Sequence, residues 1–116
     1  MDEQEPQARY LQLETQGDVV VVHFVDIQIS PDAKDELYGL VEHDGHKRLV
    51  INFSNISSLT TYAFGILANL LKKVHAAGGE MKLCSLNADL TKMFHLMKFD
   101  RVFELHANQD DALRAF

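Results

Sequence analysis

Four hydroxyl side chains gather just before a helix in the middle of the chain. They follow a buried strand that ends near Phe53 and precede a long apolar-rich helical stretch; they are Ser57, Ser58, Thr60 and Thr61. A hydroxyl at a helix start accepts a hydrogen bond from the free N–H groups of the first turn, and Thr60 is placed for that role. Capping explains one hydroxyl well, so the others are left as candidate functional groups.

Gly65 lies inside the same helical stretch. Glycine in a helix interior costs about 1 kcal/mol of stability relative to alanine. Such a cost indicates either close packing at this position or the close approach of a partner.

The chain carries no sequence signature of an enzyme. Its six glycines form neither the G-x-G-x-x-G pattern nor a phosphate-binding loop, and no serine stands in a G-x-S-x-G elbow. His43 and His46 have the spacing of metal ligands, but the short pattern favours a solvated turn. No acid, base and nucleophile converge in the sequence. We therefore expect no catalytic residue, no metal and no cofactor, in a protein that is not an enzyme.

The composition narrows the location and the partners. With 11 Lys and Arg against 17 Asp and Glu, the net charge is −6, and no basic cluster is present for a direct nucleic-acid partner. Cys84, the single cysteine, cannot form an internal disulfide and is predicted to be buried in a reducing compartment. The acidic first residues do not resemble a signal peptide, and no apolar run reaches the roughly 18–20 residues of a membrane span. We expect a cytoplasmic protein without membrane insertion.

Hydrophobic patterning predicts alternating strands and helices. Residues 1–8 are polar and predict a flexible tail, and residues 9–116 predict one domain. Short apolar runs indicate strands at 10–16, 19–24, 48–53, 80–85 and 102–106. Helical spacing and caps indicate helices from Pro31 to a stop at Gly45, and at 62–77, 89–97 and 108–116. The order ββαβαβαβα predicts an α/β fold with a mixed, mostly parallel sheet, in which the opening hairpin adds one antiparallel edge strand.

The segment from residue 52 to residue 65 resembles the STAS domain, in particular the bacterial anti-sigma factor antagonists. Asn52-Phe53-Ser54 stands where those proteins have Asp-Leu-Ser, and Thr60-Thr61-Tyr62-Ala63-Phe64-Gly65 stands where they have Asp-Ser-Ser-Gly-Leu-Gly. The run from Ala77 to Cys84, the strand at Phe103 and the ending at 110–113 are also similar to the family pattern. The resemblance covers the chain from about residue 10, in a STAS-like fold.

The resemblance implies a regulator of transcription that works by partner switching. The family's phosphorylatable serine falls on Thr61, with Thr60, Ser58 and Ser57 as alternative acceptors. The implied partner is an anti-sigma factor that is also a serine/threonine kinase of the histidine-kinase-like ATPase type. The implied partner-binding residues are Thr60, Thr61, Tyr62, Phe64 and Gly65. Of these, Thr60, Thr61 and Tyr62 are expected at an exposed mouth between the strand at 48–53 and the helix at 62–77.

Two questions stay open at this level. Phe64 is either an apolar contact for the partner or a residue of the core. Because Thr60 replaces the family's acidic residue and Tyr62-Ala63 replaces Ser-Gly, the alternative function is a STAS-like ligand-binding or scaffolding module that is never phosphorylated. The chain is expected to be a monomer or a weak dimer.

Overall fold

Five strands form one sheet in the computed structural model, which describes residues 10–116. Each strand pairs with its neighbour in the sequence, so the order across the sheet is β1-β2-β3-β4-β5. The first pair is antiparallel and the other three pairs are parallel, which confirms the predicted fold class. The predicted tail at residues 1–8 lies outside the described residues. The strands are β1 (Leu11–Gln16), β2 (Val19–Phe24), β3 (Arg48–Asn52), β4 (Glu80–Cys84) and β5 (Glu104–His106).

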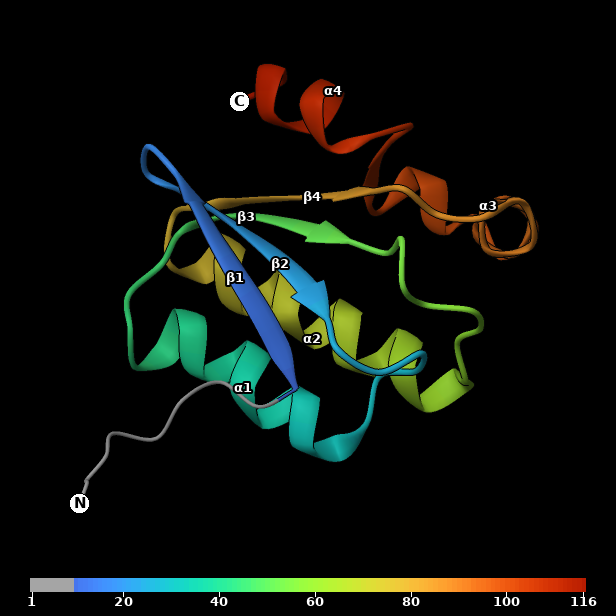
Figure 1. Cartoon of the computed structure of the whole chain (residues 1–116), viewed down its shortest axis with the longest axis horizontal. Coiled ribbons are helices and arrows are strands. Elements are labelled where there is room, and N and C mark those ends of the chain that lie inside the picture. The colour runs from blue at the N-terminus through green and yellow to red at the C-terminus, as the bar shows by residue number, and fades with distance from the viewer. Residues whose placement is uncertain (1–9) are drawn as a thin grey trace.

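Residues 10–116 contain four α-helices, and three of them cover the two faces of the sheet. They are α1 (Pro31–Glu42), α2 (Thr61–Ala76), α3 (Ala88–Leu96) and α4 (Gln109–Arg114). Each begins at a side chain that accepts a first-turn N–H; the caps are Ser30, Thr60, Asn87 and Asn108. The helices α1 and α2 lie on one face of the sheet, and α4 lies on the other (Figure 1). This arrangement places the start of α2 at the edge where the parallel strands end.

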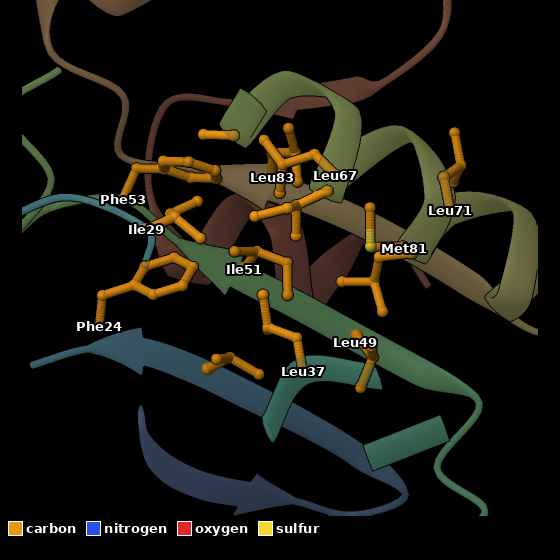
Figure 2. Packing of buried hydrophobic residues seen from close by; sticks show 14 of the residues in the cluster. Phe24, Ile29, Leu37, Leu49, Ile51, Phe53, Leu67, Leu71, Met81 and Leu83 are labelled. Atoms are coloured by element: carbon orange, nitrogen blue, oxygen red, sulfur yellow. The ribbon is translucent and has the colours of Figure 1, made fainter. Parts of the chain in front are cut away.

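The main hydrophobic core lies between the sheet and the helices α1 and α2. Successive side chains of a strand point to opposite faces, so alternate residues of β2 and β3 enter this core. Figure 2 shows residues of α1, α2 and β3 in one cluster, including the fully buried Leu37, Leu67 and Ile51. The well-packed core holds α2 against the sheet and so positions its first turn.

A second, smaller cluster lies on the opposite face under α4. It contains Val21, Val50 and Cys84 from the sheet and Ala112 from α4. The predicted burial of Cys84 is confirmed, and burial raises the pKa of its thiol. Lys82 is also buried here; its ammonium lies 2.8 Å from the Glu104 carboxylate.

The last strand is shorter than the predicted 102–106. Phe99–Arg101 form a short 3-10 helix (η1), and the N–H groups of Val102 and Phe103 both donate to the carbonyl of Phe99. Since these N–H groups are used within the turn, pairing with β4 begins only at Glu104. Phe103 is buried among aromatic rings, and its ring centroid lies 5.8 Å from that of Phe94.

Candidate functional site

The segment between β3 and α2 is held in place by side-chain amides. Asn52, which is 6% exposed, accepts from the N–H of Ser54 at 2.9 Å and donates to the Gln109 side chain of α4 at 3.1 Å. Asn55 donates to the carbonyls of Phe24 and Val25 at 2.9 and 2.8 Å. The backbone of this segment is therefore tied to β2 and to α4.

Two buried apolar residues and a third amide fix the rest of the segment. Ile56 and Leu59 insert into the main core. From the other side, Asn87 at the start of α3 donates to the carbonyls of Ile56 and Ser57 at 3.4 and 3.3 Å. These contacts fix the position of Thr60 and Thr61, which follow at the start of α2.

Thr60 and Thr61 are both exposed but have different environments. Thr60 is the N-cap of α2, and its hydroxyl accepts from the N–H of Ala63 at 3.1 Å, as predicted. Thr61 is the first residue of the helix, and within residues 10–116 its hydroxyl has no hydrogen-bond partner. Tyr62 is 51% exposed, so the three residues expected at a mouth between strand and helix are all exposed at the start of α2.

The other hydroxyls lie further back in the segment. Ser58 is exposed and its hydroxyl accepts from the Gln28 side chain at 3.2 Å. Ser57 is exposed, and its backbone N–H donates to the carbonyl of Ile27 at 3.0 Å. The segment from residue 25 to residue 28 therefore runs beside the hydroxyl-bearing segment.

Two exposed apolar residues on this neighbouring segment were not identified from the sequence. Val25 is 46% exposed and Ile27 is 59% exposed. They follow directly after β2, and the available signal was an apolar run that continues past the end of a buried strand. Their backbone carbonyls accept from the Asn55 side chain and the Ser57 N–H, so both residues lie beside the hydroxyl-bearing segment that leads to α2.

Phe64 and Gly65 differ in exposure. Phe64 is 4% exposed and packs against Phe94 and Phe99, with ring centroids at 5.2 and 5.1 Å, so it belongs to the core. Gly65 is exposed, and a Cβ added there would meet no described atom within 4 Å. The sequence left two explanations for a glycine here, close packing or the close approach of a partner. Close packing within residues 10–116 is excluded.

A small cavity lies between α1 and α2 beside these residues. Its volume is about 320 Å³, and its lining consists of Lys34, Tyr38, Tyr62, Gly65, Ile66 and Asn69. Larger cavities, of about 530 and 690 Å³, lie at the turns near Gly17 and Gly78 and beside β5. The cavity at α2 is thus the smallest of these three, and its lining includes Tyr62, which follows Thr61 in the chain.

The electrostatics of the α2 start are distinctive among the four α-helices of the described chain. The first turns of the others contain an acidic residue: Asp32 in α1, Asp89 in α3, and Asp110 and Asp111 in α4. The first turn of α2 contains none. The positive end of its helix dipole is therefore not compensated by a carboxylate within that turn.

The described residues contain neither a metal cluster nor a membrane span. Between residues 10 and 116, no three His, Cys, Asp or Glu side chains stand close enough to hold a metal ion. In the same range, every helix lacks the combination of length and apolarity needed to cross a lipid bilayer.

Known structures share this fold. An anti-sigma factor antagonist from Mycobacterium paratuberculosis is 26% identical, with a TM-score of 0.76 over 90% of this chain and 91% of that one. The Bacillus cell fate determinant SpoIIAA, solved in its phosphorylated form, is 15% identical, with a TM-score of 0.65 over 91% of this chain and 99% of that one.

Sequence comparison gives a consistent result. A Thermotoga neapolitana protein named "Putative anti-sigma factor antagonist TM1081 homolog" is 25% identical over 69 residues. That alignment spans 60% of this chain and 61% of the relative. The model of the STAS domain matches residues 10–112, which is most of the chain. The chain therefore belongs to the STAS domain family.

Proposed function

We propose that this protein is a cytoplasmic anti-sigma factor antagonist that is switched by phosphorylation of Thr61. The observation that carries the proposal is the exposed Thr61 hydroxyl, unbonded within residues 10–116, at the start of α2. In the proposed cycle, the unmodified chain binds an anti-sigma factor and thereby releases a sigma factor. The same partner, a serine/threonine kinase of the histidine-kinase-like ATPase type, then phosphorylates the chain and dissociates.

The neighbouring hydroxyls are less suitable acceptors. The Thr60 hydroxyl caps α2, and its modification would disturb a hydrogen bond whose loss costs about 1 kcal/mol. The Ser58 hydroxyl accepts from Gln28. Ser57 lies four residues before α2 and away from the positive end of the helix dipole. Thr61 combines exposure, an unengaged oxygen and a place at the helix start.

A phosphate on Thr61 would change the surface while leaving the fold intact. It adds about −1.5 to −2 charges at neutral pH. The free N–H groups and the dipole of a helix start accommodate an anion, and the first turn of α2 has no carboxylate to oppose it. A partner surface matched to a neutral hydroxyl would have to desolvate the dianion. A loss of about 3 kcal/mol lowers affinity more than a hundredfold.

The partner would meet a mixed surface around the hydroxyl. Tyr62, Ile27 and Val25 supply exposed apolar area, and Thr60 supplies a polar contact. Phe64 would act beneath this surface by fixing α2 against Phe94 and Phe99. Gly65 extends the surface along α2 by one turn.

The test is phosphorylation in vitro with a matched pair of variants. The chain is incubated with ATP and a histidine-kinase-like anti-sigma factor, and its intact mass is measured. We expect an increase of about 80 Da for the wild type and for Thr60→Ala, and no increase for Thr61→Ala. Thr61→Glu should bind the kinase at least tenfold more weakly than the wild type. Equal labelling of Thr61→Ala and the wild type would exclude Thr61 as the switch.

A second candidate is the ligand-binding or scaffolding module without phosphorylation. The observation that favours it is Tyr62, whose bulky ring stands beside Thr61 where the related motif has a small serine. A wild-type chain that binds the kinase with unchanged affinity after prolonged incubation with ATP, and that gains no mass, would support this candidate.

A further inference from the structure

Gly65 has no structural reason, within the described chain, to lack a side chain. It lies in the interior of α2, in ordinary helical conformation, and is exposed. A Cβ added at this position would meet no described atom within 4 Å. Alanine would therefore fit and would favour the helix. The bare position is explained if another molecule comes close to the helix here.

Gly65 borders the 320 Å³ cavity between α1 and α2, which we call the α1–α2 groove. Thr61, Gly65 and Asn69 are spaced four residues apart, so they follow one another along the same exposed side of α2. The groove is thus one helical turn from the proposed phosphorylation site. Any molecule seated in the groove would lie close to a group added to Thr61.

The charges at the groove define what would fit there. Lys34 is its only ionisable cation and no carboxylate lines it among residues 10–116. The Lys34 ammonium forms a solvent-exposed ion pair with Asp35 at 3.8 Å, and because the Asp35 side chain is 78% exposed this pair is weak. Asn69 adds an amide, and Tyr38 and Tyr62 add aromatic rings. The Tyr38 hydroxyl donates to the carbonyl of Ile66 at 3.4 Å, so this wall is fixed. A carboxylate side chain is complementary to such a site.

We propose that the α1–α2 groove receives an acidic segment of the anti-sigma factor, and that Gly65 is bare because this segment approaches α2 at that point. The inference rests on the proposed function and adds the chemistry of the partner. The inference also explains how a phosphate on Thr61 would weaken partner binding. Side chains four residues apart on a helix are about 5–6 Å from one another, so a phosphate on Thr61 would repel a carboxylate held above Gly65.

Gly65→Ala distinguishes a docking role of Gly65 from a structural role, because the two roles predict opposite changes in the Tm. The helix should become more stable, and we expect the Tm to rise by about 4 °C. Affinity for the anti-sigma factor should fall at least tenfold. Gly39→Ala is the matched control, because Gly39 is an interior glycine of α1 outside the groove and its added Cβ would make an ordinary 3.6 Å contact with His43. It should raise the Tm without changing the affinity.

A charge reversal tests the acidic character of the partner segment. Lys34→Glu should lower affinity at least tenfold, whereas Lys47→Glu, at the far end of the sheet, should leave it within twofold. The probe is the anti-sigma factor that phosphorylates the wild-type chain, and affinity is measured by calorimetry without ATP. If the anti-sigma factor binds the Gly65→Ala and Lys34→Glu variants as tightly as it binds the wild type, the groove proposal is wrong and the proposed function stands. If no such protein binds or modifies the wild type, both fail.

Discussion

Adjacent threonines divide two tasks at the start of α2. Thr60 uses its hydroxyl oxygen to cap the helix, and Thr61 leaves its hydroxyl exposed to solvent. A chain that needs both a stable helix and a modifiable group can keep them apart in this way. Under the proposed function, a change at Thr61 affects recognition without disturbing the helix cap, whereas a change at Thr60 affects folding.

This division predicts different stability effects for two alanine substitutions. Thr60→Ala removes the acceptor for the Ala63 N–H and should lower the free energy of unfolding by about 1 kcal/mol. Thr61→Ala removes an exposed hydroxyl and should change it by less than about 0.5 kcal/mol. Urea unfolding followed by circular dichroism measures both values. A larger loss for Thr61→Ala than for Thr60→Ala would contradict the assignment of the cap.

The edge strand β5 is tied to β4 by a buried ammonium. Lys82 is 3% exposed and contacts Glu104 at 2.8 Å, and His106 contacts the same carboxylate at 2.6 Å. Burial raises the pKa of the Glu104 carboxyl, but the hydrogen bonds from Lys82 and His106 outweigh it and the net pKa is lowered. The stabilisation from ionised Glu104 is therefore present at neutral pH and is lost as the pH falls through its folded-state pKa.

Glu104→Gln should reveal this dependence. At pH 7 we expect a loss of about 1 kcal/mol in the free energy of unfolding, a modest value because the Glu104 side chain is 49% exposed. The difference from the wild type should shrink as the pH falls below about 4, where the unfolded carboxyl is protonated. Urea unfolding at pH 7, 5 and 3.5 measures it. A difference that stays constant over this range would assign the loss to packing rather than to charge.

The elements differ in how far the sequence predicts them. The apolar run of β2 and the caps of the helices are local signals, and the predicted elements are present. Val102 and Phe103 look equally strand-like, but Phe103 packs with the rings of Phe94 and Phe99 instead of entering the sheet. The place of Ile27 beside the hydroxyls depends on its hydrogen bond with Ser57 across the fold, which no local pattern encodes.

The two faces of the sheet are covered to very different extents. The helices α1 and α2 seal the large core, whereas the six-residue α4 covers the small cluster that includes Cys84 (Figure 1). Leu113 and Phe116 pack at the edge of this cluster and are only partly buried. Access to Cys84 therefore reports on the attachment of α4 to the rest of the molecule.

Thiol labelling measures that attachment. The wild-type chain should react slowly with a thiol reagent under native conditions, because the Cys84 side chain is fully buried. Phe116→Ala removes a contact of α4 and should speed the reaction at least tenfold. Leu96→Ala, at a side chain that is 73% exposed, should leave the rate unchanged. Equal rates for all three chains would show that Cys84 is reached without release of α4.

The strand order has a consequence for how the chain is made. Since each of β2 to β5 pairs with the strand before it, each of them finds a partner already synthesised when it leaves the ribosome. Because α4 follows all five strands in the chain, a nascent chain should build its sheet first and cover Cys84 only afterwards.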